Sequence, residues 1–308
     1  MERGIDFKQW HTGLQQSIFV HQTGPSMRKL LFGTKLGIAA AVLSLSAVPS
    51  DAADPQPTRK IQYKKIGDVT LHLHAFEPDG HQASDKRPAI VFFFGGGWVG
   101  GSPKQFYPQS EHLAERGMVA YCAEYRVRKQ HGTTPFECVA DGKSAVRYIR
   151  QHAAELGVDP DRIAAGGGSA GGHVAACTGV IEGFDEQGED AEVSSVPNAL
   201  VLFNPVIDTS KKGYGHERLK ERYKEISPVE HVTKSTPPTV LFQGDADTTT
   251  PPLGARLFNE RMQELGRRCE LVEFPGAKHG FFNRGDAYMQ TLAATDQFLT
   301  SLGYLAEP

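Results

Sequence analysis

Residues 162–172 read RIAAGGGSAGG, and this stretch decides the fold. A short apolar run at 163–165 leads into a glycine-rich turn in which Ser169 stands at the centre of the pattern G-x-S-x-G, and a helical stretch follows from Gly172. A sharp turn from strand to helix lifts a serine hydroxyl away from the backbone, and larger neighbouring side chains would collide there. The stretch therefore predicts a nucleophilic serine.

The same turn fits a second glycine pattern. Gly166, Gly168 and Gly171 have the G-x-G-x-x-G spacing of a dinucleotide-binding turn. Such a site needs an acidic residue at the end of a second strand about 20 residues later. Residues 182–192 are instead a polar loop with no strand before them. The dinucleotide-binding alternative is therefore weaker than that of a nucleophilic serine. The alternative of a packing turn whose serine has no function is also weaker.

Outward from this turn, short apolar runs alternate with helical periodicities. The runs are continuous, as expected of strands covered on both faces, and lie at 89–94, 118–123, 163–165, 200–203, 240–242 and 271–274. Helices are predicted over 139–156 with Gly157 as the cap, from Pro251-Pro252 to Gly266, and over 289–302. Residues 62–66 and 69–76 predict a hairpin. We expect an α/β fold with a mostly parallel, doubly wound sheet and antiparallel N-terminal strands.

A serine nucleophile needs a base and a carboxylate, and in this fold class they follow it in the order Ser, acid, His. His279 lies between Gly276 and Gly280, just after the last apolar run, and is the predicted base. Asp247 lies in the loop after 240–242 and is the predicted acid. Asp245 competes for that role, but Asp247 is nearer the apex of the loop.

A second glycine cluster, Phe94-Gly95-Gly96-Gly97-Trp98, ends the apolar run at 89–94. Glycines there let backbone N–H groups approach a bound carbonyl, which is what stabilisation of an oxyanion requires. The alternative is a flexible turn into the next helix. Trp98 is a candidate substrate contact.

These motifs together resemble the α/β-hydrolases of the esterase/lipase type, which include acetyl esterases, bifunctional acetylxylan/feruloyl esterases and hormone-sensitive-lipase-like esterases. The resemblance covers residues 60–304. It implies an α/β-hydrolase fold without a large cap domain and a carboxylesterase that needs no metal or organic cofactor. It also implies that the backbone N–H groups of Gly96, Gly97 and Ala170 form the oxyanion hole.

One position departs from that family. The glycine cluster is usually preceded by histidine, and here Phe94 stands in its place. The histidine is thought to support the oxyanion loop, so the change puts the support of the loop in doubt. We expect hydrophobic packing of Phe94 to replace it.

The N-terminus has the three-part pattern of a secretory signal. Arg28, Lys29 and Lys35 precede an apolar run at 36–48, and small residues at Ser50 and Ala52 follow. We expect 1–52 to be an N-terminal extension with a signal at 27–52, and 53–308 to be one exported catalytic domain, periplasmic or secreted. The alternatives are an uncleaved anchor or a buried helix.

Composition excludes several other classes. The 308 residues have a formal net charge of −3, which gives no basic footprint for nucleic acid. Because none of the cysteines forms a C-x-x-C pair, a zinc or redox motif is not expected, although one disulfide stays open. We expect no stable membrane insertion after cleavage of the signal.

The substrate is predicted only in outline. The main insertion, between Pro205 and Pro237, is strongly charged in its middle and makes a poor apolar lid. An open site and export suit small esters or acylated carbohydrates, such as acetyl or feruloyl esters of polysaccharide. The alternatives are a serine peptidase of the prolyl-oligopeptidase type, for whose propeller the chain has no room, and a non-catalytic binding protein.

Overall fold

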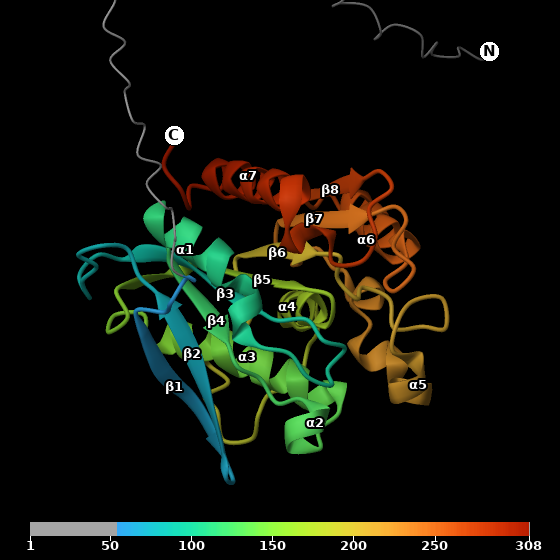
Figure 1. The fold of residues 1–308 in the computed structure, drawn as a ribbon. Coiled ribbons are helices and arrows are strands. Elements are labelled where there is room, and N and C mark those ends of the chain that lie inside the picture. The colour runs from blue at the N-terminus through green and yellow to red at the C-terminus, as the bar shows by residue number, and fades with distance from the viewer. Residues whose placement is uncertain (1–53, 308) are drawn as a thin grey trace, which may run out of the picture. The chain divides into compact units, whose positions relative to one another are not determined.

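The computed structural model describes residues 54–307, so the predicted signal lies outside the described residues. One sheet holds eight strands in the order β1-β2-β4-β3-β5-β6-β7-β8 (Figure 1). The pairs β1–β2 and β2–β4 are antiparallel and the other pairs are parallel. The predicted mostly parallel sheet with an antiparallel start is confirmed. The strands are β1 (Arg59–Ile66), β2 (Val69–Phe76), β3 (Arg87–Phe93), β4 (Val119–Ala123), β5 (Val158–Gly168), β6 (Ala199–Phe203), β7 (Thr239–Gly244) and β8 (Cys269–Phe274).

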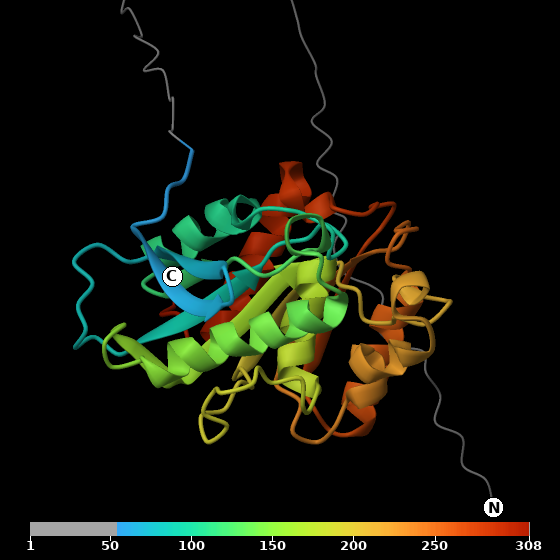
Figure 2. The same cartoon turned by 90° about the horizontal axis from the view of Figure 1, so that it is seen from below.

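Helices cover both faces of this sheet (Figure 2). The α-helices are α1 (Tyr107–Glu115), α2 (Arg128–His131), α3 (Pro135–Gln151), α4 (Ala170–Val180), α5 (His216–Leu219), α6 (Pro252–Glu264) and α7 (Gly285–Ser301). Buried side chains of α3, α4 and α6 pack on one face, and those of α1 and α7 pack on the other. Two apolar layers therefore hold the central strands rigid from both sides.

The longest helix of the first layer shows how local sequence sets its ends. Thr134 and Glu137 form a capping box at the start of α3, and Pro135 occupies the first turn, where its missing N–H costs nothing. The helix ends at Gln151, whereas the apolar periodicity predicted that it would continue to Leu156. Residues 152–157 form turns that still bury Leu156, and Gly157 has a φ of +63°.

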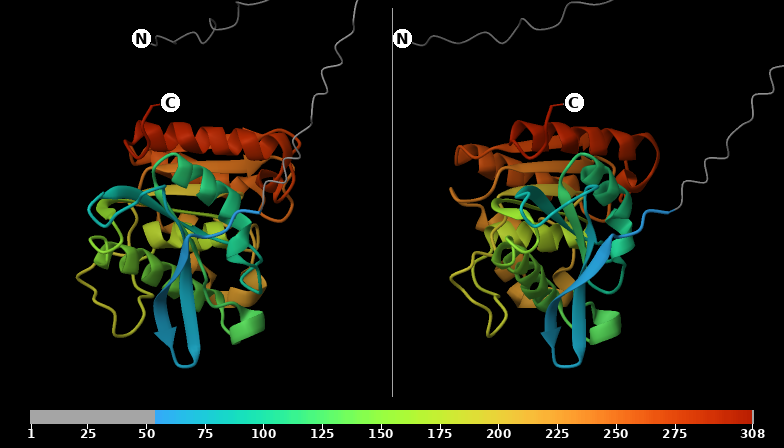
Figure 3. Two further views of the ribbon diagram at one scale, coloured as in Figure 1. Left: turned by 60° about the vertical axis from the view of Figure 1, so that its left-hand side comes forward. Right: turned by 90° about the vertical axis from the view of Figure 1, so that its left-hand side faces the viewer.

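The strands differ in burial across the sheet. Those of the centre are buried on both faces, whereas β1 and β8 are edge strands with exposed positions. Figure 3 shows the β1–β2 hairpin at the opposite end of the sheet from α7. All four cysteines are free thiols. No helix within 54–307 is both long and apolar enough to span a membrane.

Candidate active site

Ser169 forms the turn between β5 and α4 with backbone angles φ 55° and ψ −120°. A positive φ at a non-glycine residue costs on the order of 1–3 kcal/mol and persists only when the surroundings impose it. Here close backbone packing imposes it. A Cβ on Gly171 would lie 2.0 Å from the carbonyl oxygen of Phe93, and one on Gly167 would lie 2.5 Å from the carbonyl oxygen of Gly171.

The hydroxyl of this serine faces His279. Nε2 of His279 lies 2.9 Å from Oγ of Ser169, and Nδ1 lies 2.7 Å from Oδ2 of Asp247. The three residues come from the ends of β5, β7 and β8, which run parallel, so their side chains meet at one edge of the sheet. The arrangement lets Nδ1–H donate to the carboxylate while Nε2 accepts the proton of the serine.

Asp247 is held in its ionised form. Its side chain is fully buried, and Oδ1 accepts hydrogen bonds from the backbone N–H groups of Thr249 and Thr250. Burial by itself would raise the pKa of the carboxyl, but hydrogen bonds from His279 and Thr250 outweigh it and lower the pKa. Asp245 is exposed and accepts from the N–H of Gly276 instead, so it does not reach the imidazole.

The second glycine cluster lies beside the serine. Gly96 and Gly97 have φ angles of +126° and +60°, and a Cβ on Gly96 would lie 2.0 Å from the carbonyl oxygen of Gly100. Within 54–307 no backbone carbonyl accepts a hydrogen bond from the N–H of Gly96 or Gly97. Ala170 is the first residue of α4, where an N–H has no partner inside the helix. The three predicted donors are thus free to bind an oxyanion.

The support of this loop, which was in doubt because of Phe94, has two parts. The ring of Phe94 is buried and stacks on Tyr125 with ring centroids 4.2 Å apart. The hydroxyl of Tyr125 donates to the carbonyl of Phe94 over 2.6 Å. On the other side, the N–H of Gly95 donates to Oε1 of Gln105 over 2.6 Å. Ring packing and two hydrogen bonds therefore support this loop in place of a histidine.

Trp98 is placed differently from the prediction of a substrate contact. Its side chain is 1% exposed and lines no part of the cavity at Ser169. The indole packs against His173, with ring centroids 5.0 Å apart, and leaves no room for a side chain at Gly215. The insertion folds over it and covers it. Local sequence could not show this, because the covering segment is more than a hundred residues away.

Two side chains of that insertion reach the site. Tyr214 lines the cavity, and the guanidinium of Arg218 donates to the carbonyl of Gly97. The same guanidinium lies over the rings of Trp98 and Tyr214, at 5.8 and 5.6 Å from their centroids. Sequence reasoning named the insertion but missed these contacts with the oxyanion loop.

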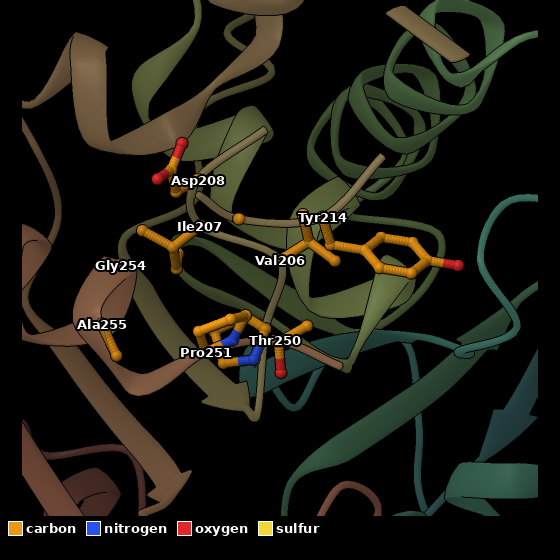
Figure 4. Close-up of a pocket in the computed structure, with 10 residues that line it drawn as sticks. Val206, Ile207, Asp208, Tyr214, Thr250, Pro251, Gly254 and Ala255 are labelled. Carbon is orange, nitrogen blue, oxygen red and sulfur yellow. The ribbon is translucent and has the colours of Figure 1, made fainter. Parts of the chain in front are cut away.

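The cavity at Ser169 is open and has a volume of about 470 Å³. It is lined by Gly95, Gly96, Gly97, Gly101, Ser102, Gln105, Ser169, Asn204, Tyr214, Thr249, His279, Gly280, Phe282 and Asn283. A second hollow lies at the base of the insertion and has room for no more than one water, at about 10 Å³ (Figure 4). Figure 4 shows Tyr214 extending away from Asp208 and Ala255.

The nucleotide alternative finds no support in the loop after α4. Three of its acidic side chains are paired with cations of β1 and α3: Asp185 with Lys143 and Arg147, Glu186 with Lys64, and Glu189 with Arg147. The glycines at 166–171 pack against backbone and rings around Ser169. This turn instead places the hydroxyl of Ser169 beside His279, and the ion pairs of the acidic loop join it to β1 and α3.

The family profile of BD-FAE matches residues 76–262, which are more than half of the chain. The chain belongs to the BD-FAE family. The solved structure of esterase 2 from Thermogutta terrifontis shares 48% sequence identity and a TM-score of 0.79, over 85% of this chain and 99% of that one. The prediction of an α/β-hydrolase of the esterase type is confirmed.

Two curated relatives of this BD-FAE member are more distant. One, from Arabidopsis thaliana, carries the name "Probable isoprenylcysteine alpha-carbonyl methylesterase ICMEL1" and is 31% identical over 63% of this chain and 45% of its own length. The acetylxylan esterase of Xylanibacter ruminicola is 25% identical over 73% of this chain and 47% of its own length. The chain spans about half the length of these curated relatives.

Proposed function

We propose that this chain is a serine carboxylesterase that hydrolyses short-chain acyl esters, including acyl esters of carbohydrates, through an acyl-serine intermediate. The observation that carries the proposal is the row of hydrogen bonds from Ser169 through His279 to Asp247, at 2.9 and 2.7 Å. The loop at 94–101 lies beside these residues, and the N–H groups of its Gly96 and Gly97 have no backbone partner within 54–307. A nucleophile, an oriented base and an oxyanion site are the three parts that acyl transfer needs.

In the proposed reaction, Oγ of Ser169 attacks the ester carbonyl while Nε2 of His279 takes its proton. Asp247 keeps the imidazole in the required tautomer and stabilises the imidazolium. The N–H groups of Gly96, Gly97 and Ala170 bind the oxyanion of the tetrahedral intermediate. His279 then gives its proton to the leaving alcohol. Water hydrolyses the acyl-serine with His279 again as the base.

Three observations support a short acyl group and an alcohol of varied size. The cavity is open, and the insertion over it is short and charged instead of forming an apolar tunnel. Structures of the Thermogutta terrifontis esterase have propionate or butyrate bound, at 49% and 48% identity to this chain. The relative from Xylanibacter ruminicola is an acetylxylan esterase. Feruloyl esters remain part of the proposal as larger acyl groups that an open cavity admits.

A chain-length series tests the proposal. Hydrolysis of p-nitrophenyl acetate, butyrate and octanoate should fall with chain length, and Ser169→Ala should abolish it with the fold intact. Acetylated xylan and methyl ferulate would follow as substrates. If the wild-type hydrolyses no ester, the carboxylesterase proposal fails, and peptide substrates and binding without turnover become the next tests.

We also propose that the protein is exported after cleavage of the segment 27–52. The proposal is supported by the positive, apolar and small-residue order of that segment. Expression of the full chain in a bacterium with a secretory pathway, followed by N-terminal sequencing of the exported protein, should give a start near Ala53. An exported or membrane-bound protein that starts at Met1 or Met27 would contradict cleavage.

A further inference from the structure

The loops on the two sides of Ser169 are joined by side-chain amides. Oε1 of Gln105 accepts from the N–H of Gly95 over 2.6 Å, and its Nε2 donates to Oδ1 of Asn283 over 3.0 Å. Nδ2 of Asn283 donates to the carbonyl of Gly280 over 2.9 Å. Gly280 directly follows His279. A continuous row of hydrogen bonds thus runs from the oxyanion loop to the loop that carries the base.

The two amides are held side by side by the elements that carry them. Gln105 lies in the 3₁₀ helix η1 (Pro103–Phe106), whose first turn is capped by Ser102. Asn283 ends the 3₁₀ helix η4 (Phe281–Asn283). The neighbouring rings of Phe106 and Phe282 stack with centroids 5.7 Å apart. Packing therefore brings together two polar side chains that are 178 residues apart in the chain.

Within 54–307, no other side chain makes the hydrogen bonds that these two amides make to the N–H of Gly95 and the carbonyl of Gly280. Phe94 has no polar atom in its side chain, and Tyr125 holds only its carbonyl. The N–H of Gly95 depends on Gln105. On the histidine side, the N–H of Gly280 donates to Oδ1 of Asn204, and its carbonyl accepts from Asn283. Gln105 and Asn283 therefore connect the two loops only as a pair: Gln105 bonds Gly95, Asn283 bonds Gly280, and the two amides bond each other.

We propose that Gln105 and Asn283 form an amide bridge that positions the oxyanion loop relative to His279. The inference rests on the proposed esterase function. Both are positioning residues, since they act through the backbone of Gly95 and Gly280. Oxyanion donors stabilise charge that develops in the transition state, so a displaced loop weakens transition-state binding more than substrate binding. Loss of the bridge should therefore lower kcat and leave KM nearly unchanged.

The test uses the full chain and the single variants Gln105→Met and Asn283→Ala, their double variant, and p-nitrophenyl butyrate. Removal of a whole oxyanion donor costs about 10²–10³ in kcat, and we expect about 10- to 100-fold for either single variant, because the donors are displaced and not removed. The double variant should cost little more than the worse single variant, because both break the same bridge. Gln263→Met is the matched control, because Gln263 donates to Asn259 on the exposed face of α6 and lines no part of the cavity at Ser169.

The outcomes separate the bridge from the proposed function. An active wild-type with kcat of Gln105→Met within about twofold of it would overturn the bridge and leave the esterase intact. A rise of KM at constant kcat would also overturn it, because that pattern assigns the amides to substrate binding. If the double variant lost kcat by the product of the two single losses, the residues would act independently, and the bridge would be overturned. A wild-type without esterase activity would overturn both proposals. Thermal unfolding of each variant checks that the fold is kept.

Discussion

The two glycine-rich turns beside Ser169 follow neighbouring parallel strands, yet they are held in different ways. The turn at 166–172 is buried apart from Ser169. A Cβ added at its glycines would collide mainly with neighbouring backbone atoms and aromatic rings. The loop at 94–101 is half exposed and depends on side chains from elsewhere, namely Gln105, Tyr125 and Arg218. The first conformation is set by close packing that leaves no room for side chains at its glycines. The second is set by hydrogen bonds from side chains outside the loop, so the two turns should respond differently to mutation.

The largest effect is expected where the serine turn meets β3. In Gly171→Ala, the new Cβ would lie 2.0 Å from the carbonyl oxygen of Phe93 in the centre of the sheet, and neither side can give way. We expect loss of soluble, folded protein, measured by expression yield and circular dichroism. Gly100→Ala is the control in the other loop, because a Cβ there meets nothing within 4 Å. A Gly171→Ala protein as stable as Gly100→Ala would refute the account of the serine turn.

The second-largest effect on activity is expected in the loop after β7, which carries Asp247. Asp247→Asn removes the charge that orients His279, and a change of this kind in a related triad lowers kcat by about 10⁴. Asp245→Asn removes only an exposed acceptor for the N–H of Gly276 and should leave kcat within about threefold of wild-type. Steady-state kinetics on p-nitrophenyl butyrate measures both. A larger loss of kcat in Asp245→Asn than in Asp247→Asn would contradict the assignment of Asp247 as the acid.

Tyr125→Phe probes the oxyanion loop with a smaller change. It removes the hydroxyl that donates to the carbonyl of Phe94 but keeps the stacked ring. The loss of one buried hydrogen bond costs about 1–3 kcal/mol when an acceptor is left without a partner. We expect lower thermal stability and a kcat reduced several-fold at an unchanged KM. An unchanged melting temperature would argue against this hydrogen bond as a support of the loop.

The smallest effect on activity is expected at Glu124, whose carboxylate bonds His72 and His74 of β2 and lines no part of the cavity at Ser169. Burial would raise the pKa of this carboxyl, but hydrogen bonds from His74 and His72 outweigh it and lower the pKa to about 2. A depressed pKa gives stability that is present above the unfolded value of about 4.3 and is lost as pH falls toward 2. Glu124→Gln should therefore destabilise the protein by about 1–3 kcal/mol near pH 7, with the difference vanishing near pH 2. Urea unfolding across this range measures it, and a pH-independent difference would contradict the assignment.

The contrast between the turns also explains how much of the molecule the sequence could predict. The serine turn, the strand runs and the order of Ser169, Asp247 and His279 are local patterns, and the structure brings these three residues together. Gln105 and Asn283 carry no local signal, because their pairing depends on how η1 and η4 pack. The burial of Trp98 likewise depends on a distant insertion. The end of α3 at Gln151 shows the same limit, since apolar periodicity continues into turns that are also buried.

The central claim is that Ser169 is the nucleophile of an esterase. The most direct measurement is reaction of the full chain with paraoxon, which phosphorylates the Thermogutta terrifontis relative, followed by peptide mass spectrometry and a parallel assay of p-nitrophenyl butyrate hydrolysis. We predict one diethylphosphoryl group, located on Ser169, and loss of activity in proportion to its occupancy. Full activity in protein whose Ser169 is completely phosphorylated, or inactivation with the label on another residue, would contradict the account.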